Sequence, residues 1–254
     1  RIPITAKQVG GVTKRDFDAV LDRVEAYYAP IIQQMGSSFK VNRDWDSSVV
    51  NASAEEYSGQ FVINMYGGLA RHPSITVDGF LLVACHETGH HLGGAPKVAG
   101  WFGNDWASNE GQADYYATLR CMRHILSQED NQKWADNMTI DPVLKRKCEE
   151  TYTVQADEYL CMRLGMAGYS GASLFHSMRN EATPIRFDTP DQNQVRQTFD
   201  DHPATQCRLD TYYQGAICLH DTNQALSNND PDLGTCSERQ GQREGVRPHC
   251  WFKP

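Results

Sequence analysis

The first long segment of the chain spaces its apolar residues as an amphipathic α-helix does. Between residues 14 and 35 they recur three or four positions apart and so share one face; they are Phe17, Val20, Leu21, Val24, Tyr27 and Tyr28. Three shorter segments follow, residues 37–45, 47–53 and 59–68, and each predicts a short β-strand. The N-terminal part therefore predicts one helix and a small sheet.

Helical patterns dominate the middle of the chain. Residues 74–94 are apolar enough for a helix that runs through the core, and they end at two consecutive glycines. Residues 109–128 predict a second strong helix. Residues 141–165 predict a third, with Asp141 as its N-cap and a proline in its first helical position.

The C-terminal part has a weaker pattern. Beyond about Gly165 the chain becomes mixed and polar, and only residues 200–219 predict another helix, with Pro203 in its first turn. From Asp221 onward the chain is rich in Asn, Asp, Gly and Pro, which favours irregular structure held by cysteines.

Together these elements predict one α+β domain, mainly helical, with a small sheet packed on the helix of residues 74–94. Residues 1–220 form the body of this domain, and residues 221–254 are an irregular, cysteine-stapled extension of it. A chain of 254 residues is long enough to bury a substantial core.

The net charge limits the class of partner. Lys and Arg number 24 against 32 Asp and Glu, which gives a formal net charge of -8 at pH 7. Because no basic surplus exists to neutralise phosphates, we expect no nucleic acid and no anionic membrane surface as partner. No apolar run approaches the roughly 18 to 20 residues that span a bilayer, so we expect no membrane span.

The eight cysteines include no Cys-x-x-Cys pair, which excludes a zinc ribbon and a thioredoxin-type redox motif. Disulfides in an exported protein explain them better. Proximity alone pairs Cys207 with Cys218 and Cys236 with Cys250, whereas Cys85 is expected to be a small buried apolar residue. We expect a mature protein, periplasmic or secreted after signal removal, with envelope proteins among its partners.

A metal-binding pattern lies near the end of the helix of residues 74–94. His86 and His90 are four residues apart and so face a common point from one side of the helix. Zinc accepts two neutral imidazoles of this kind and needs a third ligand. Glu87 is rotated to the neighbouring side, where it can contact a metal-bound water as a general base without binding the metal.

Two continuations compete for the third ligand. The motif continues toward Gly93 as in metzincins, but Pro96 occupies the position of their third histidine and cannot bind a metal. His91 cannot replace it, because it points to a different face of the helix. The alternative is Glu110, 20 residues after His90, which a second helix can present. Asp114, four residues further, shares its face and can orient a zinc histidine.

At these residues the chain resembles the gluzincin metallopeptidases, whose pattern is His-Glu-x-x-His followed by Glu-x-x-x-Asp on a second helix. The short spacing to the third ligand is similar to the thermolysin-type arrangement. Other details resemble the CAAX-prenyl-protease and HtpX-like peptidase family: Glu110, Ala113 and Asp114 match its Glu-x-x-Ala-Asp, and Asn51 and Ala52 match its Asn-Ala. The resemblance implies a zincin-like domain, and the soluble exported bacterial members are the closer comparison.

A further stretch extends the resemblance to about residues 45–215. His202, Pro203 and Arg208 match the His-Pro-x-x-x-x-x-Arg pattern of the same family. The resemblance implies that His202 reaches the metal site and that Arg208 contacts the glutamate ligand. The acidic, cysteine-bearing C-terminal part matches no known pattern, which leaves the choice of substrate open.

These observations predict a zinc-dependent endopeptidase with one Zn²⁺ per chain and a protein or peptide substrate. Glu87 is expected to activate the water, and His202 to stabilise the oxyanion. An extended substrate is expected to add to a strand formed by Phe61, Val62, Ile63, Asn64 and Met65. Two alternatives stay open, a zinc-stabilised chaperone or binding module and an aminopeptidase, and the tail from Asp221 could cover the zinc.

Overall fold

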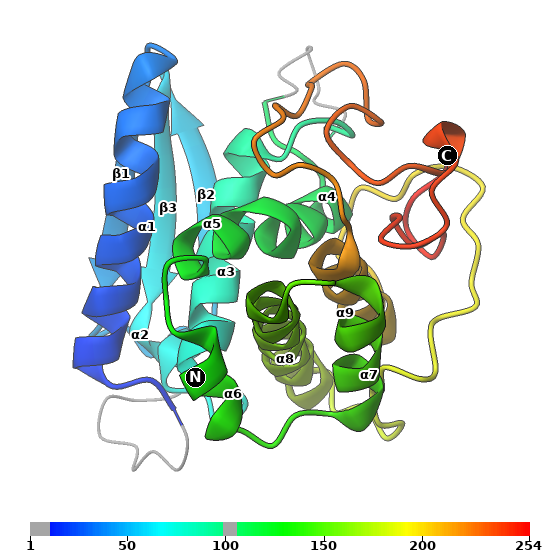
Figure 1. The fold of residues 1–254 in the computed structure, drawn as a ribbon. Coiled ribbons are helices and arrows are strands. Elements are labelled where there is room, and N and C mark those ends of the chain that lie inside the picture. The colour runs from blue at the N-terminus through cyan, green and yellow to red at the C-terminus, as the bar shows by residue number, and fades with distance from the viewer. Residues whose placement is uncertain (1–10, 99–105) are drawn as a thin grey trace.

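The computed structural model describes residues 11–98 and 106–254. In this part of the chain, most helices pack on one another beside one small sheet, which confirms the mainly helical α+β class (Figure 1). The sheet and α1 lie at one side of the molecule, and α7, α8 and α9 lie at the other. The elements are α1 (Lys14–Gln34), β1 (Ser38–Asp44), β2 (Ala52–Tyr57), β3 (Gln60–Tyr66), α2 (Gly67–Ala70), α3 (Val77–Leu92), α4 (Glu110–Tyr116), α5 (Met122–Leu126), α6 (Asn131–Asp136), α7 (Pro142–Thr151), α8 (Gln155–Met178) and α9 (Thr205–Ile217).

The helix α1 begins at a capping box, in which Thr13 and Asp16 each accept a hydrogen bond from the other's backbone N–H, at 3.2 and 3.1 Å. Its predicted apolar face is buried, except that Tyr27 is partly exposed. The ring of Phe17 stacks on Phe80 of α3 with 5.1 Å between the centroids. This contact joins α1 to the helix that carries the metal-binding motif.

The sheet has the strand order β1-β3-β2, with β3 parallel to β1 and antiparallel to β2. The expectation that residues 61–65 receive an extended substrate is therefore wrong, because β3 is central and pairs along both edges. Among the described residues, β2 pairs with β3 alone and is an edge strand. A substrate strand can add only at such an edge.

The strand β2 begins later than the pattern predicted, at Ala52 instead of residue 47. Its sequence contains two alanines and two glutamates, residues that are depleted in strands, so propensity does not reveal it. Pairing with β3, from Ala52 opposite Met65 to Tyr57 opposite Gln60, stabilises the strand instead.

The helix α3 is buried on nearly all sides, as a core helix should be. It is capped by the hydroxyl of Thr76 and ends at Leu92, where the sequence predicted its end. Glycines permit close neighbours: a Cβ at Gly79 would lie 2.2 Å from the hydroxyl of Ser170 on α8. One at Gly89 would lie 3.0 Å from the α4 backbone, so α4 and α8 both pack directly on α3.

The segment predicted as a helix over residues 141–165 is two helices. Asp141 caps α7 as expected, but α7 ends at Thr151, and α8 continues to Met178. Gly165, the last residue of the predicted segment, is a packing position, because a Cβ there would lie 2.4 Å from Cδ1 of Leu144. A Cβ at Gly168 would lie 2.6 Å from the side chain of Tyr212 on α9, so this glycine permits the two helices to touch.

All eight cysteines form disulfides, and the pairs expected from proximity are wrong. Cys207 and Cys218 lie at opposite ends of α9, about 16 Å apart at 1.5 Å per residue, whereas a disulfide needs Cα atoms within roughly 7 Å. Cys85 is buried, but it is cross-linked and not free. The pairs are Cys85–Cys121, Cys148–Cys161, Cys207–Cys250 and Cys218–Cys236.

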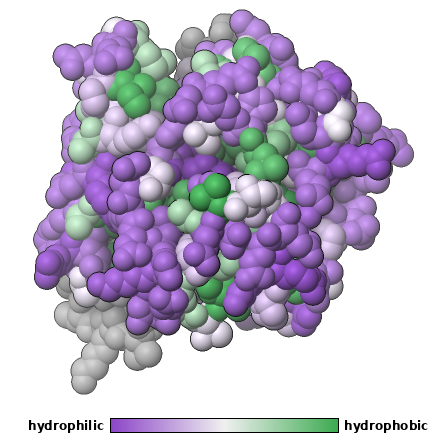
Figure 2. Space-filling model, viewed as in Figure 1, coloured by the Kyte–Doolittle hydropathy of each residue, from purple (hydrophilic) through white to green (hydrophobic). Residues whose placement is uncertain are grey.

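Residues 221–254 are irregular apart from one short turn of 3₁₀-helix, Glu238–Gln240. They pack against the π-helical stretch Ala117–Cys121 that follows α4, where Arg120 donates to the carbonyls of Gln224 and Gly234. The face of the molecule in Figure 2 is mostly hydrophilic, with hydrophobic residues in small groups. No helix in the described part of the chain is long and apolar enough to span a membrane.

Candidate metal centre

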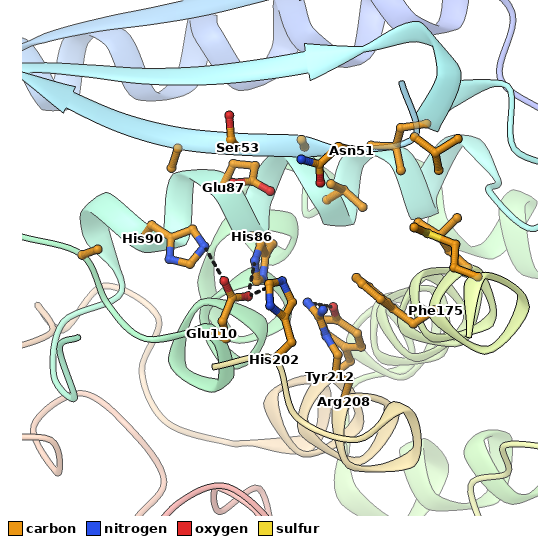
Figure 3. A pocket seen from close by; sticks show the side chains of 18 of the residues that line it. Asn51, Ser53, His86, Glu87, His90, Glu110, Phe175, His202, Arg208 and Tyr212 are labelled. Carbon is orange, nitrogen blue, oxygen red and sulfur yellow. Dashed lines mark hydrogen bonds and ion pairs between the residues drawn. The ribbon is translucent and has the colours of Figure 1, made fainter. Parts of the chain in front are cut away.

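Three side chains from α3 and α4 converge at one point (Figure 3). Nε2 of His86 lies 3.2 Å from Oε2 of Glu110, and Nε2 of His90 lies 3.7 Å from Oε1 of the same carboxylate. The ligand atoms of all three residues lie within 4.8 Å of one another. Ligands bound at 2.0–2.1 Å to a tetrahedral ion are about 3.4 Å apart. These three residues could therefore hold one metal ion.

The second ring nitrogen of each histidine lies next to an oxygen atom. Nδ1 of His86 lies 2.7 Å from Oδ1 of Asp114, and Nδ1 of His90 lies 2.8 Å from the carbonyl oxygen of Ser108. Because these oxygens can only accept, each Nδ1 carries a hydrogen, and each ring in its neutral form turns a lone pair on Nε2 toward Glu110. Two lone pairs and a carboxylate around one point repel one another unless a cation lies between them.

Without a metal, a proton supplies that cation. Burial lowers the pKa of His86, but the carboxylates of Asp114 and Glu110 outweigh it and raise this pKa to about 10. Burial and the neighbouring charge of His86 lower the pKa of His90 to about 4. The contacts with His86 hold the pKa of Glu110 well below its usual range despite burial. A metal ion that binds here must displace the proton from His86.

The N-terminus of α4 is tied to the end of α3. The side chain of Asn109 caps α4 by accepting from the N–H of Gln112 at 2.9 Å. The Gln112 amide donates to the carbonyl of Gly93 at 2.7 Å, and the N–H of Ser108 donates to the carbonyl of His90 at 2.8 Å. These bonds place the first residue of α4, a glutamate, opposite the two imidazoles.

Asp114 lies behind His86 and is paired with Arg208 of α9. Arg208 donates to both carboxylate oxygens, at 2.8 and 2.6 Å, and the hydroxyl of Tyr212 donates to Oδ1 at 2.6 Å. The guanidinium lies 3.9 Å from the ring centroid of Phe175. The implied contact of Arg208 with the glutamate ligand is therefore not present: Arg208 binds Asp114 and affects Glu110 only through its charge.

Glu87 borders the same cleft but is not one of the three clustered ligands. Its side chain is only 6% exposed and lies between the imidazoles and β2 in Figure 3. Burial raises the pKa of this carboxyl to about 7. A carboxyl with this pKa can both accept and return a proton near neutral pH.

His202 reaches the cleft from the segment before α9. Its Nε2 lies 3.3 Å from Oε2 of Glu110. Asp201 accepts hydrogen bonds from the backbone N–H of His202 at 2.7 Å and from its Nδ1 at 3.0 Å. Pro203 precedes α9, which begins at Thr205, so it does not lie in the first turn as expected. His202 thus lies beside the ligands and remains half exposed to the cleft.

The cleft over these residues has a volume of about 400 Å³. Residues 51–54, at the start of β2, form one wall. The part of the wall formed by the end of α8 was not predicted, because the predicted helix stopped at Gly165. Leu174 and Met178 are four residues apart, and this helical spacing could have indicated that the helix continues. The larger apolar lining residues include Val50, Leu69, Val83, Trp106, Leu174, Phe175 and Met178.

Three other segments considered in the sequence analysis lie outside the cluster and the cleft. His91 stacks between Phe61 and Trp106, with ring centroids 4.6 and 4.9 Å away, and so does not join the cluster. None of residues 61–65 lines the cleft. Within the part of the chain that the structure describes, no residue of 221–254 lines it either, so the tail does not cover the candidate metal site.

Comparisons of the chain with protein-family models, with curated proteins and with solved structures found no match. The chemistry of the cleft must therefore carry any statement about function.

Proposed function

We propose that this protein is a zinc-dependent endopeptidase of the gluzincin type, resembling the CAAX-prenyl-protease and HtpX-like family. The observation that carries the proposal is the convergence of two Nε2 atoms and the Glu110 carboxylate beside a buried, unligated Glu87. Three protein ligands of these types are typical of catalytic zinc, which keeps a fourth position open. Structural zinc is usually fully ligated by protein, often by cysteine, and all cysteines here are in disulfides.

The residues of the cleft suit the steps of peptide hydrolysis. A bound zinc ion would polarise the scissile carbonyl and lower the pKa of water. Glu87 takes a proton from the attacking water and passes it to the leaving amine. His202 donates a hydrogen bond to the oxyanion that develops on the carbonyl oxygen. Asp114 and Arg208 hold His86 in the tautomer that presents Nε2.

The strand β2 is our candidate for substrate binding, in place of β3. An extended peptide can add to the unpaired edge of β2 through backbone hydrogen bonds, which favours unfolded protein segments as substrates. The small side chains of Ala52 and Ala54 line the cleft at this edge and leave room for the peptide. The apolar lining near Phe175 favours a bulky apolar residue close to the cleaved bond.

The cleft favours an endopeptidase over an aminopeptidase. An aminopeptidase needs a further acidic group to bind the free amine of its substrate. Among the described residues that line the cleft, the only carboxylates are Glu87 and Glu110. Both already have roles in the proposed mechanism.

The substitution Glu87→Gln tests the proposal. We expect about one zinc per chain to remain, whereas cleavage of casein falls by about 10²- to 10⁴-fold, the usual contribution of a general base. Glu149→Gln on the exposed face of α7 is the matched control and should retain wild-type cleavage.

The other possible results of these assays each support a different conclusion. Retained cleavage in Glu87→Gln rules out the mechanism, and lost zinc makes Glu87 a ligand. Cleavage of aminoacyl reporters but not casein favours the aminopeptidase. A zinc-loaded wild-type protein without any peptidase activity favours the chaperone or binding module.

A further inference from the structure

The last residues of the chain lie directly behind the candidate metal centre. Trp251 is 0% exposed and clusters with Cys207 and Phe252. Its ring contacts α4 at Gly111, beside the ligand Glu110: a Cβ at Gly111 would lie 2.2 Å from Cδ2 of Trp251. The helix α4 therefore presents Glu110 to the metal centre and rests on Trp251 at the next residue.

The same C-terminal segment, residues 249–253, is hydrogen-bonded to the loop of residues 195–202, which carries His202. The N–H of Phe199 donates to the carbonyl of Trp251 at 2.8 Å, and the N–H of Val195 donates to the carbonyl of His249 at 2.9 Å. The N–H of Lys253 donates to the hydroxyl of Thr198 at 3.1 Å. Residues 195–199 and 249–253 therefore run side by side, and His202 follows shortly after.

The His202 loop also contacts the start of α4. The side-chain amide of Asn109 donates to the carbonyl of Phe199 at 3.2 Å and to the carboxylate of Asp200 at 3.3 Å. The N–H of Glu110 donates to the carbonyl of Asp200 at 3.5 Å. The loop thus lies between the C-terminal segment and the helix of the glutamate ligand, and its position depends on Trp251, whereas α4 is also held to α3 by its own hydrogen bonds.

The side chain of His202 makes few polar contacts of its own. It is 48% exposed, and its only polar partners in the described structure are Asp201 and Glu110. Its position therefore depends on the backbone of its loop. The disulfide Cys207–Cys250 also fixes the C-terminal segment to α9, because Cys250 precedes Trp251 and Cys207 precedes Arg208.

We propose that Trp251 is a positioning residue of this site: it sets the His202 loop against α4 and acts on turnover through His202. The inference rests on the proposed function, in which His202 stabilises the oxyanion. Nε1 of Trp251 is buried without a hydrogen-bond partner among the described residues. The shape of the ring, and not a hydrogen bond, therefore carries the role.

A double-mutant cycle with Trp251→Leu and His202→Ala tests the inference. His202→Ala should lower kcat by about 10²- to 10³-fold, as loss of an oxyanion donor does. Trp251→Leu should lower kcat by about 10- to 100-fold, with KM and zinc content little changed, because it displaces a catalytic group. In the His202→Ala background it should cause no further loss. The conservative variant Trp251→Phe should retain most of the turnover.

Trp134→Leu is the matched control, because Trp134 packs in a separate cluster and does not line the cleft. It should lower the melting temperature and leave kcat unchanged. If Trp251→Leu does not fold, Gly111→Ala displaces the same ring from the other side and replaces it in the cycle.

The outcomes separate the two proposals. Wild-type turnover in His202→Ala removes the oxyanion donor from the proposed function, and the positioning role with it. If His202→Ala lowers kcat and Trp251→Leu lowers it further by its full separate factor, the proposed function is retained and the positioning role is overturned. Wild-type kcat in Trp251→Leu overturns it as well.

Discussion

The α3–α4 pair carries the three candidate metal ligands, the C-terminal segment packs on α4 beside Glu110, and different interactions hold each in place. Capped helices and a buried ion pair between Asp114 and Arg208 hold the α3–α4 pair, together with the disulfide Cys85–Cys121 from α3 to the stretch after α4. The C-terminal segment has almost no regular structure and is held by disulfides, backbone hydrogen bonds and the ring of Trp251. The first region should therefore be the more sensitive to loss of charge, whereas the second, which lacks helices, should depend mainly on its cross-link and its contacts.

The largest effect is expected from Asp114→Ala. Arg208, only 2% exposed, would be left without its carboxylate, which should destabilise the protein by about 3–5 kcal/mol. Zinc affinity should fall by about 10- to 100-fold, because His86 loses its orienting partner. Urea unfolding and a competing chelator measure the two effects. Asp141→Ala, which removes only the cap of α7, should leave zinc affinity unchanged; an equal loss in both variants would contradict the role of Asp114.

Removing a disulfide should separate stability from turnover. Cys207–Cys250 closes a loop of 43 residues and Cys148–Cys161 one of 13, so replacing each pair by alanine should destabilise the protein by about 4 and about 3 kcal/mol. Only the first replacement should also lower kcat, because only that cross-link anchors the segment of Trp251. Denaturation curves and casein cleavage of both variants make the comparison. Equal losses of turnover would mean that the two cross-links act through stability alone.

The pH dependence tests the charge of the α3–α4 pair. In the metal-free protein the pKa of His86 is raised from 6.5 to about 10, so its contribution to stability is complete below pH 6.5 and is lost as the pH rises through about 10. Zinc must displace this proton. Its affinity should therefore rise about tenfold per pH unit between pH 6 and 8. Chelator competition measures this slope, and calorimetry in two buffers counts the released proton. An affinity independent of pH would mean that His86 is neutral in the metal-free protein.

The smallest effect in stability is expected at Asn109, which caps α4 and also holds the loop of His202. Asn109→Ala should destabilise the protein by about 1 kcal/mol, because α4 loses its cap. Asn109→Asp keeps the capping oxygen but removes the amide that donates to Phe199 and Asp200. It should retain most of the stability and still lower kcat, as melting temperature and cleavage assays would show. Wild-type kcat in Asn109→Asp would mean that this amide does not hold the His202 loop.

Much of the α3–α4 pair could be predicted from the sequence, because its features are local. A helix places residues four apart on one face, so His86 and His90 were paired without any tertiary information. The start of α7 at Asp141 and the end of α3 before Gly93 follow from the hydrogen-bonding needs of helix ends. The capping box at Thr13 is equally local.

The remaining features depend on contacts between distant segments, and only the tertiary structure decided them. Strand order made β2 and not β3 the free edge, although β3 has the stronger strand pattern. The cysteine pairs depend on where α9 and the tail meet, which sequence proximity does not indicate. The contact of Trp251 with Gly111 joins residues far apart in the chain, and neither residue alone points to a function. Hydrogen bonds within a helix are specified by neighbours in sequence, whereas the closure of the site depends on which surfaces fit together in space.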